Sequence, residues 1–63
     1  MLLVKIELDK YLYSLLGRED LVERWWHSKN IAFNNQSPYS VYQSGEEGRK
    51  QVNDYILRYC YYD

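Results

Sequence analysis

Residues that commonly carry out chemistry are scarce in this chain. Its 63 residues include a single histidine, His27, and a single cysteine, Cys60. A zinc site needs several converging Cys, His, Asp or Glu ligands, and a catalytic histidine needs a nucleophile and an orienting acid beside it. Because the sequence groups no such set, we expect no catalytic residue, no metal site and no cofactor. We predict that the chain is not an enzyme.

Two short motifs resemble reactive arrangements without meeting their requirements. Glu46 and Glu47 are adjacent, and adjacent side chains on a helix point about 100° apart, so the two carboxylates do not face each other. Gly45 and Gly48 lack the preceding strand and following lysine of a phosphate-binding loop. Cys60 lies near a helix C-terminus, which does not activate a thiol, and we expect it to be a buried apolar residue.

Charge and hydropathy argue against two classes of partner. The formal net charge is −1, with 8 Lys and Arg against 9 Asp and Glu, so the chain lacks the positive field that collects phosphates. No apolar run approaches the roughly 18 residues that span a bilayer, and Lys5 and Glu7 interrupt the apolar N-terminus. We therefore expect a cytoplasmic protein that binds neither nucleic acid nor membranes.

Tyrosine is the unusual component of this chain, which contains 8 tyrosines and 2 tryptophans. A tyrosine ring offers a large contact area at low entropic cost, and Tyr, Trp and Arg dominate binding hot spots. Core filling explains any one ring, but it explains all the tyrosines together less well. We predict a protein-binding module whose contact residues are Trp26, Tyr42, Arg58, Tyr59, Tyr61 and Tyr62.

The N-terminal segment has two competing patterns. Apolar and charged residues alternate over its first positions as in a strand, while Val4, Leu8, Leu12 and Leu15 fall on one helical face. We favour a helix from about residue 5, with an extended segment or a short strand before it. Gly17 is suited to end that helix in the left-handed conformation.

A second helix and a structured loop should follow. The helix is expected to begin near Glu19, because an acidic residue suits the positive end of a helix dipole. Its apolar residues recur at intervals of three and four: Leu21, Val22, Trp25 and Trp26. Periodicity is lost over residues 28–36, where Asn34 and Asn35 tolerate left-handed backbone and Phe33 is expected to anchor the loop.

Two more helices are expected to complete the chain. Ser37 is a favourable N-cap and Pro38 suits the first helical position, which predicts a short helix ending near residue 43. Ser44 and Glu47 fit a capping box for a final helix over about residues 46–59. Its apolar stripe consists of Val52, Tyr55, Ile56, Tyr59 and Cys60. The chain is thus predicted to be one mainly α domain, residues 1–63, built as a compact bundle of about four helices.

Residues 16–62 resemble the toxin-binding domain of Xre/MbcA/ParS-type bacterial antitoxins. In that family a helix ends in Trp-Leu, a Pro-Asn loop and an apolar-Gly-Gly turn follow, Ser/Thr-Pro opens a short helix, and an acidic residue with Gly opens the last one. The matching positions are Trp25-Trp26, Asn30, Ala32-Phe33, Ser37-Pro38 and Glu47-Gly48, with Val52 and Ile56 behind them. Lys29 replaces the loop proline and Asn34-Asn35 replace the paired glycines, whose positive φ asparagine can adopt. The segment between Pro38 and Gly48 is also slightly longer than in the family.

The resemblance implies both a function and a partner. Domains of this family look like clamps that bind a RES-type toxin, an NAD-consuming enzyme, and block its active site with residues near their C-terminal end. Antitoxins of this kind usually carry a DNA-binding helix-turn-helix domain ahead of the toxin-binding one. Too few residues precede residue 16 to form such a domain, so we expect a stand-alone antitoxin that does not act as a repressor.

Two alternatives to the antitoxin hypothesis remain open from the sequence. A phage or mobile-element protein could reuse this fold to bind a host protein, such as an enzyme. A structural or assembly protein could use the tyrosine-rich surface to form a homo-oligomer.

Overall fold

The computed structural model describes residues 2–60, apart from the side chain of Cys60. Its elements, in chain order, are α1 (Lys5–Leu16), α2 (Glu19–His27), the 3-10 turn η1 (Ile31–Phe33), α3 (Pro38–Gln43) and α4 (Glu46–Cys60). Within the described range there is no strand, only an isolated bridge between Asn30 and Gln36. The prediction of a mainly α bundle of four helices is confirmed.

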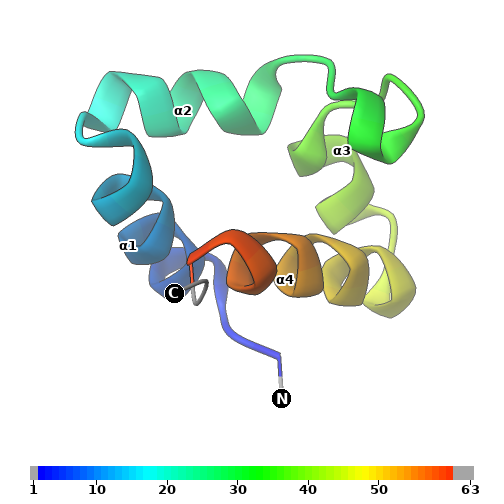
Figure 1. The fold of residues 1–63 in the computed structure, drawn as a ribbon. Coiled ribbons are helices and arrows are strands. Elements are labelled where there is room, and N and C mark those ends of the chain that lie inside the picture. Colours follow the sequence, from blue (N-terminus) through cyan, green and yellow to red (C-terminus); the bar gives the residue numbers. More distant parts are fainter. Residues whose placement is uncertain (1, 61–63) are drawn as a thin grey trace.

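The four helices form a closed ring. Helices α2 and α4 lie opposite each other, and α1 and α3 connect them at the two sides (Figure 1). Contacts run from α1 to α2 and α4, and from α3 to α2 and α4. Each helix therefore turns its apolar face inward. The core residues, each less than a tenth exposed, are Leu8, Leu12, Val22, Trp26, Phe33, Val41, Val52 and Ile56.

The turns follow the local chemistry of their residues. Gly17 ends α1 at φ 85°, and its N–H donates to the Tyr13 carbonyl over 2.7 Å. Asn34 and Asn35 adopt φ values of 58° and 65°, so the loop after α2 keeps left-handed positions without glycine. Phe33 is buried and anchors that loop in the core. These three sequence predictions are confirmed.

Helices α3 and α4 both begin where predicted, but α4 is not capped as predicted. The Ser37 side chain accepts the N–H of Ser40 over 3.1 Å, and Pro38 occupies the first turn. The capping box predicted from Ser44 and Glu47 is wrong. Helix α4 begins at Glu46, so Ser44 stands two residues before it, and its hydroxyl donates to the Val41 carbonyl over 2.6 Å at the end of α3.

An extended segment before α1 is tied to the last helix. Val4 has φ −77° and ψ 164°, and its N–H donates to the Glu7 carboxylate over 3.2 Å. One residue earlier, the Leu3 N–H donates to Oδ1 of Asn53 over 2.9 Å. Asn53 is only 2% exposed, so this long-range hydrogen bond lies where water competes little. The expectation of an extended N-terminal segment is confirmed.

Gly48 allows α3 and α4 to approach each other closely. A Cβ atom at this position would collide with the Val41 carbonyl oxygen and with Oγ of Ser44. Gly48 is buried, and the atoms it faces include backbone that cannot rotate away. The glycine of the acidic-Gly pair at the start of the last helix is therefore a packing requirement of this fold.

We expect Gly48→Ala to lower the free energy of unfolding by about 1–3 kcal/mol, the usual cost of overpacking. Urea unfolding followed by circular dichroism would measure the change. In an unconstrained helix interior the same substitution stabilises by about 1 kcal/mol, so the sign is diagnostic. Gln51→Ala, at an exposed position of the same helix, is the control and should change stability little. An equal or higher stability for Gly48→Ala would contradict the close approach.

Candidate protein-binding surface

The last described turns of α4 present an exposed pair of predicted contact residues. Arg58 and Tyr59 are both exposed, Tyr59 to 54%. The Tyr59 ring lies 4.9 Å from the ring of Tyr55, which lies 5.2 Å from Phe33 and 6.2 Å from Trp25, centroid to centroid. Tyr59 is therefore the outermost member of an aromatic cluster that reaches into the core.

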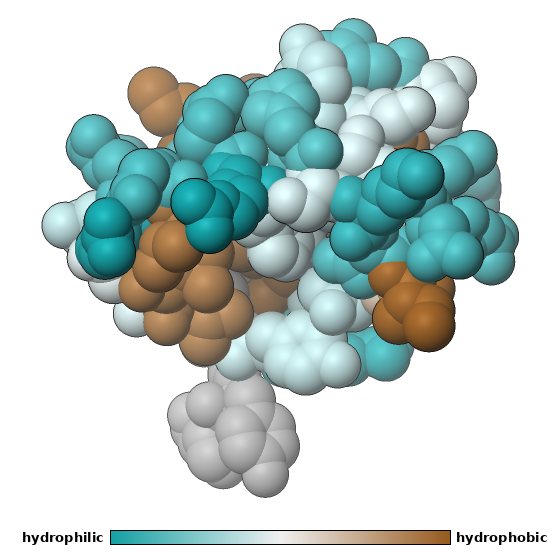
Figure 2. All heavy atoms as spheres, turned by 90° about the horizontal axis from the view of Figure 1, so that it is seen from above, coloured by the Kyte–Doolittle hydropathy of each residue, from teal (hydrophilic) through white to brown (hydrophobic). Residues whose placement is uncertain are grey.

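An apolar groove runs beside Tyr59. It has a volume of about 140 Å³. Leu15, in the last turn of α1, forms part of its wall and is 55% exposed, although it falls on the apolar face of that helix. Viewed onto α2, hydrophobic side chains gather on the α1 side of an otherwise largely hydrophilic face (Figure 2). The groove is lined by Leu12, Leu15, Trp25, Tyr55, Ile56 and Tyr59.

The surroundings of Tyr55, which lines the groove, favour its neutral form. Burial raises the pKa of Tyr55 above its ordinary value of 10.0, and the neighbouring Tyr59 raises it further by charge repulsion and a hydrogen bond. Both effects favour the protonated phenol. A partner entering the groove therefore meets aliphatic side chains, aromatic rings and hydroxyl groups.

Arg58 faces a different hollow from Tyr59. It lines a pocket of about 380 Å³ between α4 and the loop after α2, together with Phe33, Asn34 and Asp54. Tyr55 lines both hollows. The end of α4 thus offers an apolar groove and a more polar pocket on adjacent sides of the Tyr55 side chain.

Tyr42 lies elsewhere. It is half-buried in α3, its ring meets the Trp26 indole edge-on at 5.5 Å, and the Arg49 guanidinium stands 5.8 Å from its centroid. Arg49 is in the first turn of α4, ten residues before Tyr59, which is about 15 Å along a helix axis. The structure therefore does not bring Tyr42 into one surface with Arg58 and Tyr59.

Trp26 does not lie on the surface at all. Its side chain is 0% exposed, and its indole N–H donates to Oδ1 of Asp9 over 2.6 Å. The Lys5 ammonium lies 4.8 Å from the indole centroid and 3.4 Å from the other Asp9 oxygen. The assignment of Trp26 as a contact residue is wrong for this structure, because helix packing turns the indole inward and Trp25 toward the groove.

The other residues singled out in the sequence lie outside the described range or away from the groove. Tyr61, Tyr62 and the Cys60 side chain lie outside the described residues. His27 is half-exposed at the end of α2, 3.1 Å from a Glu23 carboxylate oxygen and 4.9 Å from the Tyr39 ring centroid.

Over residues 2–60, no group of three or more His, Cys, Asp or Glu side chains is placed to hold a metal. No helix in that range is long and apolar enough to cross a membrane.

Comparison with known proteins identifies the family. The model of the antitoxin Xre/MbcA/ParS C-terminal toxin-binding domain matches residues 12–61, which is most of the chain. The chain belongs to this family. No curated protein and no solved structure matches it. Membership gives the chain a toxin-binding antitoxin role and a protein partner. The family is not an enzyme family.

The structure adds three features of this toxin-binding domain that sequence reasoning missed. Leu15 contributes to an open groove, Asp9 holds the buried indole, and Asn53 binds the N-terminal segment. Of these three features, only the exposure of Leu15 could have been predicted from the sequence. It is the last apolar residue of its stripe before the helix ends at Gly17, where packing partners run out.

We expect Asp9→Ala to lower the free energy of unfolding by about 1–3 kcal/mol, because it leaves the Trp26 N–H buried without an acceptor. Urea unfolding monitored by circular dichroism at 222 nm would measure it. Asp20→Ala is the matched control, since Asp20 pairs with Arg18 on the surface, where an ion pair contributes less than about 1 kcal/mol. Equal losses for the two variants would contradict a structural role for Asp9.

Proposed function

We propose that the toxin bound by this domain is a RES-type enzyme, which consumes NAD, and that the domain inhibits it by obstructing its active site. The toxin class is supported by the series of motifs that this chain shares with antitoxins of this kind, from Trp25-Trp26 to Glu47-Gly48. Two of the sequence departures leave the fold intact, because Asn34 and Asn35 take the positive φ values that glycines would.

The proposed contact surface is the C-terminal end of α4 with the groove beside it. Arg58 and Tyr59 are exposed there, and Leu15 lines the groove together with Tyr59. Arginine and tyrosine are residue types enriched in hot spots. Tyr61 and Tyr62 follow in sequence and belong to the proposed surface. Trp26 and Tyr42 do not, because one is buried and the other lies beside the start of α4.

The groove suggests how the toxin is gripped. A cavity of about 150 Å³ with apolar walls accommodates a benzene ring, and this groove has a volume of about 140 Å³. One aromatic or leucine side chain of the toxin therefore fits between Leu15 and Tyr59. Inhibition by obstruction requires no chemistry from the domain, and it should be stoichiometric.

The exposure of Tyr59 at this groove, with the exposed Arg58 next to it in sequence, is the observation that carries the choice of surface. We expect one equivalent of the domain to stop NAD consumption by a purified RES-type toxin. Tyr59→Ala should weaken binding by about 30-fold, which corresponds to about 2 kcal/mol for a hot-spot residue. Calorimetric titration gives the affinity, and fluorimetric detection of NAD gives the inhibition.

Tyr13→Ala is the matched control, because Tyr13 is a tyrosine of similar exposure, 49%, that does not line the groove. It should bind and inhibit as the unmodified chain does. If Tyr59→Ala and Tyr13→Ala bind equally well, the proposed surface is wrong. If the unmodified chain leaves NAD consumption unchanged, the proposed toxin class is wrong.

A further inference from the structure

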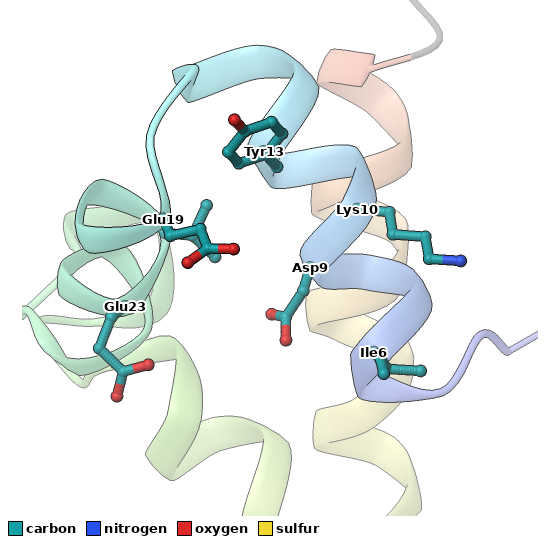
Figure 3. A pocket seen from close by; sticks show the side chains of 7 residues that line it. Ile6, Asp9, Lys10, Tyr13, Glu19 and Glu23 are labelled. Atoms are coloured by element: carbon teal, nitrogen blue, oxygen red, sulfur yellow. The ribbon is translucent and has the colours of Figure 1, made fainter.

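A larger hollow lies between α1 and α2, away from the groove at Tyr59. It has a volume of about 480 Å³ and is walled by Ile6 and Tyr13 of α1 and by Val22 of α2 (Figure 3). Ile6 is 67% exposed and Tyr13 is 49% exposed, while Val22 belongs to the core. The hollow therefore offers an open apolar surface above a packed floor.

Negative charge surrounds this hollow. The carboxylates of Asp9, Glu19 and Glu23 extend into the gap between the two helices, whereas the Lys10 ammonium is directed away from it (Figure 3). Asp9 already holds Trp26 and Lys5, and Glu23 contacts His27. Glu19 forms no ion pair with a described cation. An apolar group that carries a cation beside it would match both properties of the hollow.

The chain itself presents such a group at another corner. Ile31, the first residue of η1, is 87% exposed, more than any other large hydrophobic residue among those described. Lys29, two residues earlier, is also exposed. The loop that carries them is fixed, because the Asn30 side chain accepts the Ala32 N–H over 2.9 Å and the Asn30 N–H donates to the Gln36 carbonyl over 3.1 Å. Little backbone entropy is lost when a residue on such a loop is bound.

We propose that the α1–α2 hollow binds the Ile31 corner of a second copy of this chain. Ile31 covers the apolar wall formed by Ile6 and Tyr13, and Lys29 lies among the carboxylates of Asp9, Glu19 and Glu23. The α1 side and the η1 side are at opposite ends of the ring, so one molecule cannot make this contact with itself (Figure 1).

The contact is head-to-tail, because the hollow and the corner lie at opposite ends of the ring and one partner cannot cover both (Figure 1). In the resulting dimer one copy keeps a free hollow and the other keeps a free corner, so assembly continues beyond the dimer unless a ring closes. A single side chain and one ion pair make a small interface, so we expect the two copies to associate weakly. The toxin surface at the end of α4 takes no part, so this proposal stands independently of the proposed function.

Sedimentation velocity over a concentration range from about 20 μM to 1 mM tests the proposal, since weak contacts are populated there. The mean mass should rise above the 7.7 kDa of one chain. Ile31→Asp removes the corner and Tyr13→Lys removes the hollow, so each variant alone should remain monomeric. An equimolar mixture of the two retains one intact corner and one intact hollow, and it should form a dimer that grows no further.

Val4→Ser is the control, because Val4 is 54% exposed but lies outside both surfaces, and it should assemble as the unmodified chain does. Circular dichroism would check that the exposed substitutions leave the fold intact. A constant mass of 7.7 kDa across the range would overturn the proposal. So would undiminished assembly of either surface variant, or a mixture that stays monomeric.

Discussion

Burying an indole in so short a chain requires an acceptor for its N–H, and in this protein the acceptor comes from a different helix. The Trp26 N–H of α2 donates to Asp9 of α1. The indole ring also lies under the Lys5 ammonium of α1 and makes a T-shaped contact with the Tyr42 ring of α3. One side chain thus fixes the relative positions of three helices. A small domain buries only about 60% of the surface that its unfolded chain exposes, so such a shared contact matters more than it would in a larger protein.

The fourth helix closes the ring through two further contacts. At its start, Gly48 lets α4 pass close to the end of α3, and near its middle Asn53 binds the backbone of Leu3. The first of these contacts leaves no room for a side chain, and the second satisfies a buried polar group. With its first two-thirds held in this way, α4 carries Arg58 and Tyr59 outward on a rigid support. A rigid support lowers the entropic cost of binding, which suits a domain whose role is to bind a toxin.

Features set by neighbouring residues could be read from the sequence, and features set by the packing of helices could not. Gly17, Asn34 and the Ser37-Pro38 pair each specify a local backbone conformation, and each was predicted correctly. Trp25 and Trp26 are adjacent and chemically alike, so periodicity placed both on the apolar face without deciding which one faces the core. That choice depends on Asp9, an acceptor 17 residues away.

Helix packing, which the sequence pattern does not specify, also explains the other differences between prediction and structure. Ser44 and Glu47 have the spacing of a capping box, but the close contact at Gly48 makes Ser44 part of the end of α3 instead. Tyr42 and Tyr59 are the same residue type, and only the arrangement of the helices places Tyr42 of α3 beside the start of α4 and Tyr59 near its end. The prediction that the chain binds a protein is confirmed by the family it belongs to, whereas the location of the contact surface stays a prediction.

The central claim is that the toxin is held at the C-terminal end of α4 and the adjoining end of α1. Hydrogen exchange of the chain, alone and in complex with a RES-type toxin, tests this claim most directly, because it reports each segment of the backbone separately. The account predicts slower exchange in the complex at the last turns of α4 and α1, with α3 and the start of α4 unchanged. Protection confined to α3 and the start of α4, with none at the end of α4, would contradict it.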